Sequence, residues 1–248
     1  MKRIRIFIDH QNFTIGWRKR SSHGDRKILW DRLPDLILKE LERCGFVQEG
    51  TADLRGVTVY ASVDPKRGCA PGSEHHFLKY ELDQLPSYTV RISDRQERQC
   101  EHDPQITHMV EKGVDTKIVC DMLALAMRDH YDLAVIVSDD SDLVPSVQCV
   151  QDIMDRQIVH LGFKDSFCRE MRSAAWGHIT MDSLVDGLRG PEKNGVRPPP
   201  SRPTPLQGQM ASAFEDAEKP SRTRRRRRRR RPTQDVPSAG DSAAPAVS

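Results

Sequence analysis

The chain has 248 residues, of which 37% are hydrophobic and 30% charged, and its formal net charge is +3 at pH 7. This length suits one large domain or two small ones, and no run of about 18 or more apolar residues is present that could span a membrane. The first residues, MKRIRIFIDH, hold too short an apolar run for a signal peptide. We therefore expect a cytoplasmic protein whose six cysteines, none in a CxxC pair, stay reduced.

Charge is divided between an acidic body and a basic end. Residues 1–190 contain 26 Lys and Arg against 30 Asp and Glu, a net charge of −4, whereas residues 191–248 contain 13 against 6, a net charge of +7. The basic end includes eight consecutive arginines at 224–231, many prolines and few β-branched or aromatic residues. Such a segment buries too little apolar surface to offset its ordering entropy, so we expect a folded domain over 1–188 and a disordered tail over 189–248. A polyarginine segment favours polyanions, either nucleic acid or an anionic membrane surface, and is also typical of a localisation signal.

Short apolar runs and helical patterns alternate along the first 188 residues. Continuous apolar runs predict buried strands at 4–8, 57–62, 133–138 and 157–163, with a weaker strand at 89–92. Amphipathic patterns predict helices at 31–43, 114–129 and 145–156. Residues 68–105 are polar and show no decisive pattern. The alternation predicts an α/β domain with a central, mainly parallel sheet between two layers of helices.

Carboxylates follow two of the predicted strands. Asp9 directly follows the first strand, Asn12 comes three residues later, and Asp139, Asp140 and Asp142 follow the strand at 133–138. Because the carboxyl ends of parallel strands share one edge, where ligands bind, these side chains are expected to face one crevice. Asp115 stands at the start of the predicted helix at 114–129, where the helix dipole favours a charged carboxylate.

Gathered carboxylates need a neutralising partner. Two charges about 4 Å apart repel by roughly 4 kcal/mol at an effective dielectric constant near 20. Protonation, basic side chains or a divalent cation could offset this repulsion. Asp and Asn oxygens suit a hard cation such as Mg²⁺ or Mn²⁺ better than zinc, and such ions commonly contact phosphate oxygens and activate water. The alternative is that these residues only form turns or cap helices, Asp142 being a candidate cap for the helix at 145–156.

Three segments resemble the NYN domain family of PIN-like nucleases, in the family's order: FIDHQN at 7–12, KGVDTKIVCDML at 112–123 and YDLAVIVSDDSDLVPSV at 131–147. The resemblance covers roughly residues 3–180 and implies a PIN-like α/β sandwich with Mg²⁺- or Mn²⁺-dependent ribonuclease activity. The metal ligands and catalytic residues that it implies are Asp9, Asp115, Asp140 and Asp142. Asn12 would support them, Ser138 and Ser141 could bind phosphate or orient ligands, and Lys112 is either a phosphate contact or a solvated loop lysine.

Several positions leave alternatives open. Asp139 stands where the family commonly has glycine, so its carboxylate could be an extra ligand or point outward, and Leu143 replaces a common phenylalanine. Asp121 matches an acidic position of the family, but it lies about 240° around the helix from Asp115 and ranks second. Trp17, followed by three basic residues, fits either stacking on a base of single-stranded RNA or a place in the core.

Together these residues predict an endoribonuclease that hydrolyses RNA phosphodiesters with metal-activated water. RNA is the expected partner, DNA is left open, no membrane association is expected, and the sequence is compatible with a homodimer. The alternative is a non-catalytic RNA-binding or regulatory module that uses the arginine-rich tail.

Overall fold

The computed structural model describes residues 1–19, 26–100, 107–166 and 168–192. These residues belong to a compact unit over Met1–Val196. From residue 193 onward, the tail that the composition predicts lies outside the described residues. Within the ranges given, no helix is both long enough and apolar enough to cross a membrane.

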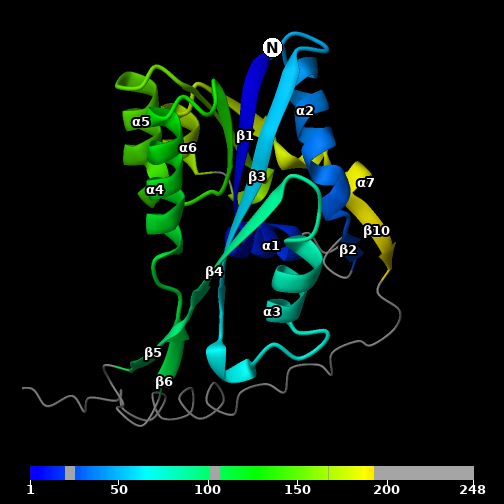
Figure 1. The fold of residues 1–248 in the computed structure, drawn as a ribbon, viewed down its shortest axis with the longest axis vertical. Helices are drawn as coiled ribbons and strands as arrows, with labels where there is room; N and C mark the ends of the chain where they lie inside the picture. The colour runs from blue at the N-terminus through cyan, green and yellow to red at the C-terminus, as the bar shows by residue number, and fades with distance from the viewer. Residues whose placement is uncertain (20–25, 101–106, 167, 193–248) are drawn as a thin grey trace, which may run out of the picture. The chain divides into compact units, whose positions relative to one another are not determined.

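A six-stranded sheet forms the centre of the unit, and all of its neighbouring strands are parallel (Figure 1). Its strands, in spatial order, are β4 (Tyr88–Asp94), β3 (Ala52–Val63), β1 (Lys2–Asp9), β7 (Leu133–Val137), β8 (Gln157–Gly162) and β9 (Gly177–Thr180). The chain adds strands outward from β1 through β3 to β4, and then on the other side of β1 from β7 to β9. The topology therefore reverses between β1 and β7.

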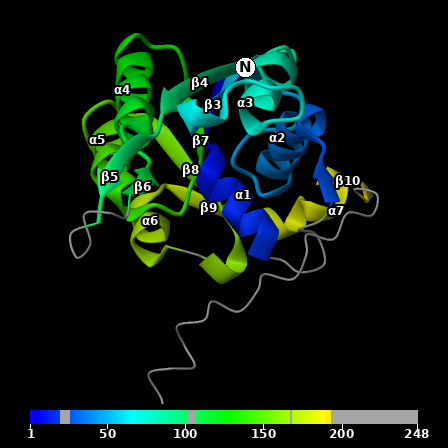
Figure 2. The same ribbon diagram turned by 90° about the horizontal axis from the view of Figure 1, so that it is seen from below.

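Helices cover both faces of this sheet. One face carries α4 (Val114–Met127), α5 (Val144–Asp152) and α6 (Arg169–Ala174), and the other carries α1 (His10–Lys19), α2 (Leu33–Arg43) and α7 (Val185–Leu188), as Figures 1 and 2 show. The short α3 (Glu74–His76) runs into the π-helix η3 (Phe77–Leu82) ahead of β4. Short 3-10 helices lie at η1 (Trp30–Arg32), η2 (Pro65–Arg67), η4 (Ser141–Leu143), η5 (Lys164–Ser166) and η6 (Met181–Ser183).

Two small antiparallel pairs lie outside the main sheet. β2 (Arg26–Ile28) pairs with β10 (Arg189–Glu192), and β5 (Gln96–Gln99) pairs with β6 (Thr107–Val110). The first pair means that the chain immediately after residue 188 still contacts the body of the domain.

The core consists of two apolar clusters, one on each face of the sheet. Along β1, Ile6 and Ile8 pack into the cluster beneath α1 and α2, whereas Phe7 packs into the cluster beneath α4 and α5. This alternation is the period of two that a strand imposes on its side chains. It places Asp9, the last residue of β1, on the same face as Phe7 and α4.

This architecture confirms the predicted α/β fold with a central parallel sheet between helical layers. Helix α1 is the main element that the sequence analysis missed. Its buried residues His10, Phe13, Gly16 and Trp17 have helical spacing, but glycine at position 16 hides the apolar stripe. A Cβ atom at Gly16 would lie 2.3 Å from Cδ2 of Phe163, so a side chain there would block the packing of the helix.

Candidate acidic site at the carboxyl edge of the sheet

The predicted site residues of β1 and β7 meet where the sheet topology reverses. The two strands pair in parallel from Ile4 with Leu133 to Ile8 with Val137, so Asp9 and Ser138 follow their last paired residues at the same edge. In open α/β sheets, ligands bind outside the carboxyl ends of the strands at this reversal. Asp9 and the aspartates after β7 therefore lie where a ligand site is expected.

Asp9 is a buried carboxylate held by two hydrogen bonds. Asp9 is only 5% exposed. Its carboxylate accepts hydrogen bonds from the backbone N–H of Asn12 at 3.0 Å and from the hydroxyl of Ser138 at 3.2 Å. Burial raises the pKa of Asp9 to about 6, because desolvation outweighs the Asn12 hydrogen bond, and the charges of Glu111 and Asp115 raise it further. The charged form of Asp9 is therefore destabilised unless a cation approaches.

Asn12 and Ser138 tie the end of β1 to the loop after β7. The Asn12 side-chain oxygen accepts from the backbone N–H of Asp139 at 3.1 Å, and the Ser138 hydroxyl accepts from the backbone N–H of Asp140 at 3.2 Å. Ser138 is 2% exposed, so its hydroxyl orients Asp9 and the loop and does not face solvent. These two residues act on the geometry of the carboxylates.

Asp140, and not Asp142, caps a helix after β7. The carboxylate of Asp140 accepts from the backbone N–H of Asp142 at 2.9 Å and caps the 3-10 helix η4. A carboxylate has about four lone-pair positions, so this bond leaves Asp140 free to accept further contacts. Asp142 is exposed.

Asp115 joins these aspartates from the start of α4. Burial raises the pKa of Asp115, and the charges of Asp140, Glu111 and Asp142 act in the same direction. The helix dipole was expected to favour its charged form, but desolvation and repulsion outweigh that effect. Asp9, Glu111, Asp115, Asp140 and Asp142 thus form one electrostatically connected group, here called the acidic cluster.

Glu111 is the member of the acidic cluster that the sequence analysis missed. It lies just before the KGVD segment and accepts a hydrogen bond from the Ser62 hydroxyl at the end of β3. An acidic residue four positions ahead of Asp115 was a visible signal, but nothing local indicated which way its side chain would point.

The donor chemistry of the acidic cluster fits a hard divalent cation. All five side chains offer oxygen ligands, and the charged forms of two of them are destabilised by burial and by one another. Among the described residues, no group of three or more His, Cys, Asp and Glu side chains is arranged closely enough to hold an ion as it stands. Ion binding would therefore require some of these carboxylates to move closer together.

Asp139 does not point outward, which was one of the two arrangements that the sequence left open. Its side chain is 7% exposed and turns inward to His160 of β8, with 3.1 Å between Oδ1 of Asp139 and Nε2 of His160, which is fully buried. A Cβ atom at Gly162 would lie 2.3 Å from the same Asp139 oxygen, so glycine there makes room for the carboxylate. The carboxylate that replaces the family's glycine is accommodated by a histidine and a glycine two residues apart on the next strand.

Asp121 stands apart from the acidic cluster. It accepts a hydrogen bond from the Tyr60 hydroxyl at 2.8 Å and forms an ion pair with Arg91 at 2.5 Å. The charge of Asp121 is therefore balanced within the fold.

Basic and polar side chains border the acidic cluster. Arg95, directly after β4, donates to the Ser62 hydroxyl at 3.1 Å and to the Gln11 side-chain oxygen at 3.3 Å. Lys112 and Ser141, both predicted to contact substrate, are exposed. Arg95 lies in the stretch 68–105, whose sequence showed no decisive pattern, and its proximity to the site follows from the place of β4 in the sheet.

Trp17 is a core residue. Its side chain is 2% exposed and stacks on Phe13 with 6.3 Å between the ring centroids. The neighbouring His10 is also buried, and desolvation lowers its pKa to about 4, with further lowering by the charges of Arg18 and Arg95. His10 is therefore neutral at physiological pH.

Comparison with known proteins agrees with this architecture. The profile of the NYN domain matches residues 3–182. The crystal structure of a protein of unknown function from Vibrio parahaemolyticus is similar in fold, with a TM-score of 0.50 and 17% sequence identity over 73% of this chain and 93% of that chain. No curated protein matches the chain significantly. The matched profile spans most of the chain and carries with it the PIN-like nuclease fold, so the chain belongs to the NYN domain family.

Proposed function

We propose that the chain is a Mg²⁺- or Mn²⁺-dependent endoribonuclease that acts at the acidic cluster. The observation that carries this proposal is the meeting of carboxylates from β1, the start of α4 and the loop after β7 at one edge of the sheet, where burial and nearby negative charges disfavour the charged forms of Asp9 and Asp115. A site that only stabilised the fold would gain by replacing such charges, because uncompensated buried carboxylates cost free energy.

Each residue of the site has a distinct part in the proposal. Asp9, Asp115, Asp140 and Asp142 would hold the ion, and Glu111 adds a fifth oxygen donor. When bound, Mg²⁺ or Mn²⁺ supplies an activated water and stabilises the charge that develops on the leaving oxygen. Ser138 and Asn12 fix the Asp9 carboxylate through the hydrogen bonds described above, so that it stays aimed at the cluster.

The substrate would approach from the exposed side of the cluster. Lys112 is a candidate phosphate contact there, Ser141 is a candidate hydrogen-bond donor, and Arg95 adds a half-buried positive charge beside Glu111. Phosphate binding by such groups positions a nucleic acid without reading its sequence.

The direct test uses the full chain with end-labelled RNA and with DNA of the same sequence. We expect RNA cleavage with Mn²⁺ or Mg²⁺, loss of cleavage with a chelator, and recovery when the metal is restored. Equal cleavage of DNA would retain the metal chemistry and remove the RNA specificity. Cleavage that persists undiminished in chelator would contradict the proposal.

The arginine run at 224–231 is proposed to raise RNA affinity without carrying out chemistry. Replacing these eight arginines by glutamine should weaken RNA binding and flatten its salt dependence, since the slope of affinity against salt is about 0.7 per phosphate neutralised on a single strand. Metal-dependent turnover at saturating RNA should persist. Binding and turnover are measured separately, by anisotropy titration and by single-turnover cleavage. If RNA binding is lost and the parent chain shows no turnover, the chain is a binding module that uses its tail.

A further inference from the structure

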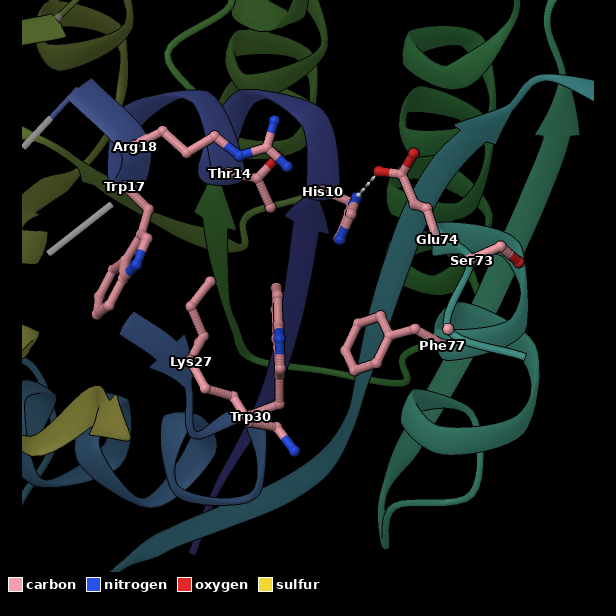
Figure 3. Close-up of a pocket in the computed structure, with 11 residues that line it drawn as sticks. His10, Thr14, Trp17, Arg18, Lys27, Trp30, Ser73, Glu74 and Phe77 are labelled. Atoms are coloured by element: carbon pink, nitrogen blue, oxygen red, sulfur yellow. Dashed lines mark ion pairs between the residues drawn. The ribbon is translucent and has the colours of Figure 1, made fainter. Parts of the chain in front are cut away.

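A pocket lies on the α1 side of the sheet. It has a volume of about 400 Å³ and lies between α1, the strand β2, the 3-10 helix η1 and the segment that leads into η3 (Figure 3). Its walls include His10, Arg18, Lys27, Trp30, Glu74 and Phe77. The volume falls within the range of about 300 to 1,000 Å³ that small-molecule sites occupy.

One wall of the pocket is aromatic and tightly supported. The Trp30 ring stacks on His10 with 5.8 Å between centroids and a 23° angle between planes, and it meets Phe77 at 6.4 Å. Trp30 is 6% exposed, so the body of its ring is fixed by the core and only part of it borders the pocket. A planar ligand can stack on such a surface with little loss of side-chain entropy, because the rings are already immobile.

The remaining walls are polar and carry both signs of charge. Figure 3 shows Arg18 on α1, Lys27 beside Trp30, and Glu74 on the opposite side with its carboxylate toward His10. The distance between Oε1 of Glu74 and Nδ1 of His10 is 3.7 Å, which is too long for a strong hydrogen bond, and the Glu74 side chain is 44% exposed. The Glu74 carboxylate therefore keeps capacity to accept from a ligand.

The position of the pocket links it to the cluster. Asp9 and His10 are consecutive residues, and Asp9 faces the acidic cluster while His10 lines the pocket. Arg95 bridges the two, because it contacts Gln11 next to His10 and Ser62 next to Glu111. Arg95 therefore places a positive charge between His10 of the pocket and the edge of the cluster.

We propose that this pocket binds one base of the single-stranded RNA whose backbone passes the acidic cluster. The inference rests on the proposed nuclease function and adds a base-recognition site to it. Stacking of a base on aromatic side chains, with cations nearby for the phosphates, is how proteins hold single-stranded RNA. The Glu74 carboxylate favours guanine, whose adjacent N1–H and N2–H groups both donate, over uracil, whose single N–H lies between two carbonyl oxygens.

Equilibrium binding of mononucleotides to the full chain tests the pocket. Calorimetric titration is carried out in chelator with guanosine 5′-monophosphate, uridine 5′-monophosphate and ribose 5-phosphate, which has the sugar and phosphate but no base. We expect guanosine monophosphate to bind about tenfold or more tightly than ribose 5-phosphate, as the stacking of one base allows. Equal affinity of these two ligands would overturn the proposal.

Matched variants on α1 locate the binding. Thr14 lines the pocket, whereas the next residue, Ile15, is 42% exposed and does not. Thr14→Trp should abolish binding of guanosine monophosphate by filling the space, and Ile15→Trp should leave it unchanged. Glu74→Gln, at a side chain that is 44% exposed, should reduce the preference for guanosine over uridine monophosphate several-fold even if Thr14→Trp fails to fold. Unchanged preference in Glu74→Gln, or unchanged binding in folded Thr14→Trp, would contradict the proposal.

The two levels of the proposal fail in different ways. If the parent chain cleaves RNA but does not distinguish guanosine monophosphate from ribose 5-phosphate, the base pocket is wrong and the nuclease function stands. If the mononucleotide binds and Thr14→Trp blocks it, but RNA is never cleaved, the pocket is a nucleotide site and the nuclease function is wrong.

Discussion

Asp9→Asn and Asp140→Asn are each expected to lower the rate of Mn²⁺-dependent RNA cleavage by at least about 100-fold. The physical reason is that a bound metal ion supplies several kcal/mol of charge stabilisation, and each 1.36 kcal/mol changes a rate about tenfold. Each substitution removes one negative charge from the acidic cluster while keeping the shape of the side chain. The measurement is single-turnover cleavage of labelled RNA by full-length protein.

Asp121→Asn provides a matched control for this experiment. Asp121 lies on the same helix as Asp115, but it pairs with Arg91 and Tyr60 and is not a member of the acidic cluster. It should therefore keep the parent cleavage rate within a few-fold. Parent rates in both Asp9→Asn and Asp140→Asn, purified free of contaminating nuclease, would remove the proposed mechanism.

The same Asp9→Asn substitution is expected to stabilise the metal-free protein at neutral pH. The folded-state pKa of Asp9 is about 6, and the unfolded value is about 3.9, so the folded chain binds this proton more tightly. The Asp9 carboxylate therefore does not destabilise the folded parent protein below about pH 4. The destabilisation grows as the pH rises to about 6 and is complete above that value. A pKa difference of about two between the folded and unfolded states corresponds to roughly 3 kcal/mol in the free energy of unfolding. Asp9→Asn should regain about 1 to 3 kcal/mol of this, and not always all of it, because asparagine accepts the existing hydrogen bonds less well.

Urea unfolding of both proteins in chelator, from about pH 4 to about pH 8, measures this effect, and the advantage of the variant should appear only toward the upper end. Added Mn²⁺ should reverse the order of stability. An ion present at about 100 times its Kd stabilises the native parent protein by about 2.7 kcal/mol, or roughly 5 to 10 °C in Tm for a domain of this size. A variant less stable than the parent in chelator at every pH would show that the Asp9 carboxylate stabilises the fold by itself.

Local sequence patterns were sufficient to determine the fold class and most of the candidate site. Apolar runs such as 4–8 and 133–138 mark strands buried on both faces, and each of them is followed by aspartate. An apolar run and the polar residue that ends it are both local features of the chain, so they can be recognised without coordinates. The edge location of Asp9 and Asp140 followed from the parallel arrangement that such runs favour.

The tertiary structure alone decided which distant residues face these aspartates. Glu111 and Arg95 both contact Ser62 at the end of β3, the strand beside β1, and Arg95 does so because β4 lies on the other side of β3. Asp139 turns inward because β8 offers His160 and, two residues later, Gly162. These contacts join segments that are remote along the chain, and their side-chain directions depend on strand order and packing. The direction of the Asp115 pKa shift was decided in the same way: helix position favours the charge, but the burial and repulsion that oppose it exist only once the chain is folded.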